Sequence, residues 1–211
     1  HLYTAASGTS AISGSGYITA IAFKTSGAVA SAFTCTGVTI KMGNTNLTAL
    51  TSTFASNVDR GQGSAKTVLQ DATITVPAGA ANSMLKIDLT TPFYYNGVDN
   101  IVVDFIRAGT CSGDVSTTYD NTLPNNMALW SFGIADVTGN LDAVPNMRFY
   151  FTGGETAVEF GGTPGGGNGY PFSATVERVQ MLYLASEITG TGPILGLAFQ
   201  ADAVTSAGTY T

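Results

Sequence analysis

The chain repeats part of its own beginning near its end. The segment Gly-Tyr-Ile-Thr-Ala-Ile-Ala-Phe at residues 16–23 is followed 176 positions later by Gly-Pro-Ile-Leu-Gly-Leu-Ala-Phe at residues 192–199. A period this long corresponds to a whole domain per repeat, because solenoid repeats are only about 20 to 50 residues long. The sequence therefore predicts a complete domain at 1–154, a glycine-rich linker at 155–169, and a C-terminal extension at 170–211 that resembles the first strands of a second repeat.

Short segments with alternating side chains predict an all-β fold. Ile101, Val103 and Phe105, for example, share one face of a strand, because alternate side chains point to opposite sides. Glycine, asparagine, aspartate and proline separate such segments, which is typical of a sandwich or barrel. The expected strands are 17–24, 37–42, 67–76, 84–89, 100–107, 128–135 and 147–152, followed by 179–184 and 194–200 in the extension. We expect them to form a jelly-roll-like β-sandwich.

One segment has a helical pattern instead. Leu47, Leu50 and Phe54 are spaced as residues on one face of a helix, and Thr45 precedes them as a candidate N-cap. The sequence therefore predicts one short helical turn within residues 46–57. We expect this turn to cover an open end of the sandwich.

Two cysteines, Cys35 and Cys111, lie in separate strand-like segments. In an oxidising compartment, a disulfide between them closes a loop of about 75 residues and contributes on the order of 4 kcal/mol to stability. The alternative is a pair of buried free thiols. A zinc site is not expected, because two cysteines and the single histidine, His1, do not supply four ligands.

Charged residues are scarce, at 10% of the chain against about 25% in ordinary soluble domains. The net charge is −6, and lysine and arginine form no cluster that could neutralise nucleic-acid phosphates or an anionic membrane. No apolar run reaches the roughly 18 residues that a membrane-spanning helix needs. Together with the start at His1 rather than methionine, this composition predicts a processed, extracellular or cell-surface protein with no nucleic-acid partner and no membrane insertion.

Two stretches resemble a known class of repeat. Residues 40–45 read Ile-Lys-Met-Gly-Asn-Thr before the helical pattern, and residues 91–100 read Thr-Pro-Phe-Tyr-Tyr-Asn-Gly-Val-Asp-Asn after the strand at 85–90. They resemble the tandem jelly-roll-like β-sandwich repeats of large secreted bacterial surface and adhesin-type proteins, over residues 16–107 and more weakly over 178–199. The resemblance implies a role similar to that of adhesin stalks and matrix proteins, and it brings no catalytic residues.

Candidate catalytic groups are few. A nucleophilic serine or cysteine is usually activated by a histidine base, and His1 is the only histidine in the chain. Asp88 and Asp104 are the candidates for a glycosidase pair, which needs two acids about 5 to 10 Å apart. Because each alternates with apolar neighbours, we expect both to be solvated on outward faces. The sequence therefore predicts that the protein is not an enzyme and uses no metal or cofactor.

Sugar binding is the alternative function. Lectin-like jelly rolls bind sugars through exposed aromatic side chains and loop amides. Tyr94 and Tyr95 are the stacking candidates, because alternation places one of them outward. Trp130 lies between Leu129 and Phe132 and is expected in the core. The alternative prediction is a carbohydrate-binding or adhesin module of a secreted multi-repeat bacterial protein, with a polysaccharide as its partner.

The main functional prediction rests on the extension at 170–211. Forty-two residues do not bury a core alone, and unpaired strand edges invite pairing with other chains. Strand addition to a neighbouring copy is a heterologous contact, and repeating such a contact without closure produces a filament. The sequence therefore predicts a structural subunit that assembles with itself, head to tail, into a fibre, sheath or surface layer.

The apolar residues of the extension are the expected assembly interface. They are Leu182, Leu184, Ile194, Leu197 and Phe199. The sequence leaves a second placement open, in which the extension folds back onto its own sandwich as extra strands. A domain at 1–154 that owns its core is expected to fold without the extension.

Overall fold

The computed structural model describes residues 15–58, 65–120, 126–152, 158–159, 167–168 and 177–183. These residues form antiparallel β-strands and one five-residue helix, so the predicted all-β fold class is confirmed. The strands are β1 (Gly16–Lys24), β2 (Phe33–Thr45), β3 (Lys66–Val76), β4 (Met84–Tyr95), β5 (Asn100–Arg107), β6 (Thr117–Asp120), β7 (Ala128–Ser131), β8 (Asn140–Asp142), β9 (Val144–Pro145), β10 (Met147–Phe151), β11 (Val158–Glu159), β12 (Gly167–Asn168) and β13 (Glu177–Tyr183), and the helix is α1 (Phe54–Val58).

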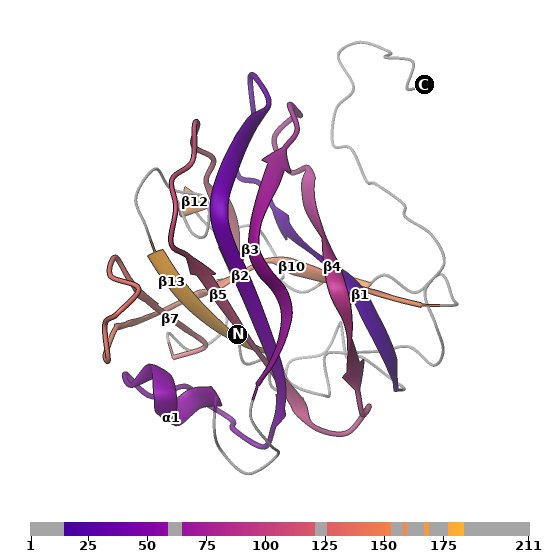
Figure 1. Cartoon of the computed structure of the whole chain (residues 1–211), viewed down its shortest axis with the longest axis vertical. Helices are drawn as coiled ribbons and strands as arrows, with labels where there is room; N and C mark the ends of the chain where they lie inside the picture. The colour runs from indigo at the N-terminus through magenta and orange to yellow at the C-terminus, as the bar shows by residue number, and fades with distance from the viewer. Residues whose placement is uncertain are drawn as a thin grey trace.

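The described strands lie in two larger sheets and one small sheet (Figure 1). The four-stranded sheet has the order β11-β10-β1-β4, and the six-stranded sheet has the order β3-β2-β5-β13-β7-β8. Phe23 of β1 meets Phe105 of β5 edge to face, with ring centroids 5.9 Å apart. The inner faces of the two sheets therefore share one core, in a sandwich-like arrangement. A bridge between Thr25 and Thr117 joins the end of β1 to the small sheet, β12-β6-β9.

The core faces are those that the alternation predicts. Ile101, Val103 and Phe105 of β5 are fully buried, and Leu85 and Ile87 of β4 are buried in the facing sheet. All seven strands expected in the first domain are present, as β1, β2, β3, β4, β5, β7 and β10. The strands that the sequence analysis missed are β6, β8, β9, β11 and β12, which have only two to four residues each and so carry little periodicity.

The helical turn is shorter than the predicted segment and occupies only its end. Only the end of the expected segment is helical, as α1. Thr45 belongs to β2, and its Oγ1 accepts a hydrogen bond from the backbone N–H of Leu47 at 3.2 Å, which closes a turn instead of capping a helix. Asn57 Oδ1 then accepts from the N–H of Thr51 at 2.8 Å and fixes the chain ahead of α1. Asn57 also reaches Gln180 of β13, so α1 packs against the six-stranded sheet rather than over an open end.

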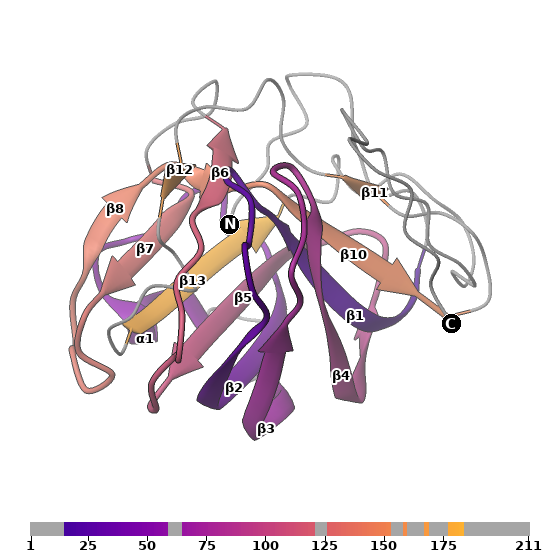
Figure 2. The ribbon, with the colours of Figure 1, turned by 90° about the horizontal axis from the view of Figure 1, so that it is seen from above.

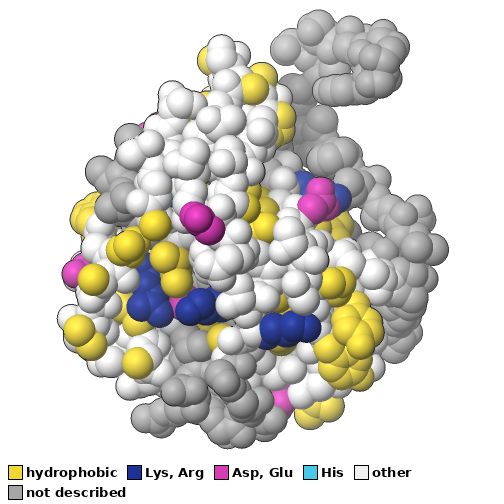
Figure 3. Space-filling view, viewed as in Figure 1, with side chains coloured by type: hydrophobic (Ala, Val, Ile, Leu, Met, Phe, Trp, Pro, Cys, Tyr) yellow, Lys and Arg dark blue, Asp and Glu magenta, His cyan; other side chains and the backbone are white. Residues whose placement is uncertain are grey.

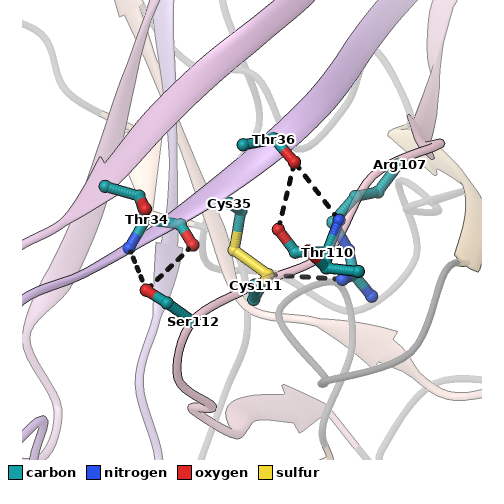
Figure 4. Close-up of a disulfide and its surroundings, with 7 residues drawn as sticks. All are labelled: Thr34, Cys35, Thr36, Arg107, Thr110, Cys111 and Ser112. Atoms are coloured by element: carbon teal, nitrogen blue, oxygen red, sulfur yellow. Dashed lines mark hydrogen bonds between the residues drawn. A yellow bond between two sulfur atoms is a disulfide. The ribbon is translucent and has the colours of Figure 1, made fainter.

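A disulfide joins Cys35 of β2 to Cys111, which confirms the expected pairing over two free thiols. Figure 4 shows the segment around Cys111 lying along β2. The backbone N–H of Ser112 donates to Thr34 O at 2.9 Å, and the N–H of Thr34 donates to Ser112 Oγ at 3.1 Å. Cys35 itself is fully buried. The crosslink therefore lies inside a hydrogen-bonded strand contact at the edge of the core.

Gly37 allows this segment to approach β2 closely. Its φ is 67°, a backbone conformation that glycine adopts without steric cost. A Cβ at this position would lie 2.5 Å from the backbone nitrogen of Gly109. A larger residue at position 37 would therefore push away the segment that carries Cys111.

The C-terminal extension contributes β13 to the chain's own six-stranded sheet. All seven residues of β13 pair with β5, and residues 178–181 also pair with β7 on the other side. Figure 2 shows β13 between these two strands. This is the second of the two placements that the sequence leaves open. Residues 184–211, including the expected strand at 194–200, lie outside the described residues, so the proposed domain boundaries stay predictions.

Candidate functional site

A cluster of buried side chains lies on the outer face of the six-stranded sheet, where β13, β5 and α1 meet. Its members, which we call the Asp104 cluster, are Asp104, Arg178, Gln180, Phe54 and Asn57. Because Phe105 faces the core, the neighbouring Asp104 points to the outer face. Gln180 is the direct cross-strand partner of Asp104 and therefore points the same way.

The ion pair between Asp104 and Arg178 is bidentate. Arg178 Nε donates to Asp104 Oδ1 at 3.1 Å, and Arg178 Nη2 donates to Asp104 Oδ2 at 2.9 Å. The Asp104 side chain is only 1% exposed and that of Arg178 is 19% exposed. A buried carboxylate requires such pairing, because an unpaired charge is costly away from water. Removing one partner of a buried ion pair typically costs about 3 to 5 kcal/mol.

The segment around α1 closes the cluster from outside the sheet. The Cζ atom of Arg178 lies 4.5 Å from the centroid of the Phe54 ring, which is a cation–π distance. Asn57 Nδ2 donates to Gln180 Oε1 at 3.3 Å. Phe54, Asn57 and Gln180 are all buried. Two residues of β13, Arg178 and Gln180, thus hold the strand to β5 and to α1 at the same time.

The structure does not bring Asp88 and Asp104 together. Asp88 lies on β4 of the four-stranded sheet with its side chain 77% exposed beside Lys86. Asp104 lies on the outer face of the other sheet, so the two carboxylates do not form the close pair that a glycosidase needs. The expectation of a solvated carboxylate holds for Asp88 and is wrong for Asp104. Arg178, the partner of Asp104, is 74 positions away in the sequence, and no local sequence pattern links these two residues.

Tyr94 and Tyr95 point to opposite sides of β4. Tyr95 is fully buried, so it does not stack on a ligand, and burial together with the charge of Asp99 raises the pKa of its hydroxyl. Tyr94 is 50% exposed, and its ring lies edge to face against Tyr17 of β1 with centroids 5.3 Å apart. Tyr17 is an exposed aromatic residue that the sequence analysis missed, because the register between β1 and β4 is not visible in the sequence.

The β7–β8 hairpin carries exposed apolar side chains. Trp130, expected in the core, is only partly buried and packs against the core, and its ring centroid lies 5.0 Å from that of Phe132. Phe132, Ile134, Val137 and Leu141 are four of the seven exposed large hydrophobic residues that the structure describes. Figure 3 shows several separate hydrophobic side chains on the side of the molecule where Figure 1 labels β7. Exposed apolar groups clustered in this way are typical of a contact surface.

The expected assembly residues fall largely outside the part of the chain that the structure describes. Leu184, Ile194, Leu197 and Phe199 lie beyond β13. Leu182 lies within β13, where its backbone pairs with Val102 of β5 in the same chain.

Among the described residues, no group of three or more histidine, cysteine or acidic side chains could hold a metal ion. In the same part of the chain, no helix has the length and apolar character needed to cross a membrane. Comparisons with known protein families, curated proteins and solved structures find no significant match to the chain. The resemblance to surface-protein repeats therefore stays a prediction.

Proposed function

We propose that this protein is an extracellular structural subunit that assembles with copies of itself, through β-strand contacts, into a fibre, sheath or surface layer. One observation carries the proposal: the six-stranded sheet is completed by β13, which enters between β5 and β7. The 25 residues from 152 to 176 separate β13 from β10. Exchange of one identical element between subunits is a low-cost route to assembly.

The slot between β5 and β7 does not distinguish the chain's own β13 from that of a neighbour. The chains are identical, so β13 makes the same hydrogen bonds and side-chain contacts in either slot. Only the connection favours the chain's own strand, by an effective concentration that is in the millimolar range for short flexible linkers. Exchange therefore competes when subunits are concentrated, as they are in a growing fibre.

Two further features support assembly outside the cell. The exposed apolar hairpin extends from β7, which is a direct neighbour of β13, so a subunit that donates its strand comes close to this surface. The disulfide is compatible with an oxidising, extracellular environment.

Size measurement under native conditions tests the proposal. We expect light scattering after gel filtration to show oligomers that grow with concentration, and negative-stain electron microscopy to show filaments or sheets. Replacing Ile134→Ser and Val137→Ser on the exposed hairpin is expected to reduce assembly without unfolding the protein. Asp88→Ala, on the other sheet, serves as the control and should assemble normally. A monodisperse monomer of 21.6 kDa that stays soluble at high concentration contradicts the proposal.

One observation favours polysaccharide binding as a second candidate function. Tyr17 and Tyr94 form an exposed aromatic pair, and aromatic rings stack on the apolar faces of sugars. On a glycan array, we expect Tyr17→Ala and Tyr94→Ala to weaken binding about tenfold or more, which corresponds to 1.4 kcal/mol or more. Phe132→Ala, which removes an exposed ring elsewhere, is the matched control. The candidate is wrong if the unmodified protein retains no glycan, or if the tyrosine variants bind as well as the control.

A further inference from the structure

We infer that the slot between β5 and β7 accepts β13 from a second copy of this chain, and that the Asp104 cluster fixes the register of the donated strand. The inference rests on the proposed function, and it names the partner and the contact. Its physical basis is charge complementarity: Asp104 belongs to the slot, whereas Arg178 belongs to the strand.

Backbone pairing alone does not fix the register of β13. A shift of two residues keeps the ladder of hydrogen bonds and the same side chains on each face. However, the shift gives the position of Arg178 to Val176 or to Gln180. With Gln180 there, Arg178 moves away from Asp104 and the buried carboxylate loses its cation, which strongly disfavours that register. With Val176 there, Arg178 takes the place of Gln180 opposite Asp104, and the hydrogen bond between Gln180 and Asn57 is lost.

A shift of one residue is excluded by a different cost. It turns every side chain of the strand to the opposite face of the sheet. Arg178 and Gln180 would then face the apolar core instead of Asp104 and Asn57. The ion pair and the amide contact therefore accept β13 in one register only. A slot with this requirement accepts only a strand with the sequence of β13, either the chain's own or that of another copy.

The connection before β13 is long enough for exchange between touching subunits. β12 pairs with β6 through residues 167 and 168, and eight residues, 169–176, follow before β13 begins. Fully extended, this segment spans about 30 Å. A donated strand therefore reaches the slot of a neighbour in contact, while β12 keeps its pairing with β6. If each subunit donates its β13 to the next subunit and accepts β13 from the previous one, the contact repeats without closing. Such a repeated contact builds a filament.

Charge reversal in two different chains tests the exchange. Asp104→Arg places two cations together in every copy, and Arg178→Asp places two carboxylates together, so neither variant pairs with itself. When the two variants are mixed, each chain's strand meets an opposite charge in the other chain's slot. Because a variant that does not fold alone remains usable in urea, the chains are mixed unfolded at 1:1 and refolded together. We expect native mass spectrometry, with one chain isotope-labelled, to show at least tenfold more mixed complex than self-complex.

The double variant Asp104→Arg with Arg178→Asp is the matched control, because it restores the pair within every copy. We expect it to fold and assemble as the unmodified chain does. A second complementary pair, Asn57→Lys and Gln180→Glu, changes the amide contact instead of the ion pair and should also give mixed complexes. If neither pair of variants gives a mixed complex, the inference is overturned.

The outcomes separate this inference from the proposed function. Mixed complexes that stop at a closed pair of chains support strand exchange and contradict the fibre. Filaments of the unmodified chain without any mixed complex support the fibre and overturn strand exchange, because another surface then joins the subunits.

Discussion

A chain that ends at Gly162 is expected to lose its cooperative fold. Among the described strands, β7 pairs only with β13 and β8, so removing β13 detaches the β7–β8 hairpin from the rest of the sheet. A two-stranded hairpin is at best marginally stable on its own. Met127 and Leu129 are fully buried in this part of the chain. Detachment of the hairpin therefore opens the core, and the loss is comparable with the whole stability of a domain, about 5 to 15 kcal/mol.

Thermal and urea unfolding followed by circular dichroism measure this effect. We expect the chain ending at Gly162 to show no cooperative transition and to bind a hydrophobic dye. A chain ending at Tyr183 keeps β13 and is the matched control, expected to unfold cooperatively. The sequence analysis predicts instead that residues 1–154 own a complete core. A Gly162 chain that melts as cooperatively as the control would support that prediction, and β13 would then be an accessory strand.

The sequence predicts those parts of the fold that depend on residues close together in the chain. Ile101, Val103 and Phe105 alternate along one strand, and this alternation alone identifies the buried face of β5. The disulfide is also accessible to sequence reasoning, because Cys35 and Cys111 are the chain's only cysteines. These inferences depend on neighbouring residues or on elimination, and they need no knowledge of which strands pair.

The candidate site depends on contacts between distant residues, and the sequence does not reveal it. Asp104 alternates with apolar residues in the way that a solvated carboxylate does, and only the placement of β13 brings Arg178 to it. The same holds for Tyr17 and Tyr94, which meet through the register of two strands. The helical spacing of residues 46–57 predicts a longer helix than α1. The side chain of Asn57 accepts a hydrogen bond from the backbone of Thr51, and this bond competes with helix formation before α1.

Loss of the Cys35–Cys111 disulfide is expected to lower the melting temperature by on the order of 10 °C. The crosslink spans 76 positions, and closing a loop of this length removes about 4 kcal/mol of chain entropy from the unfolded state. For a chain of this size, each kcal/mol shifts the melting temperature by roughly 2 to 4 °C. Calorimetry of the oxidised chain, the reduced chain and the double variant Cys35→Ala with Cys111→Ala measures the shift.

Comparing the reduced chain with the double variant separates the crosslink from packing. Cys35 is fully buried, so alanine removes core contacts as well as the bond, whereas reduction removes the bond alone. We therefore expect reduction to account for most of the shift and the alanines to add a smaller loss. Thiol labelling of the denatured, unreduced chain should find no free cysteine, which checks that the bond is present. If the reduced chain melts within a degree or two of the oxidised chain, then the hydrogen bonds between Thr34 and Ser112 hold this segment in place without the crosslink.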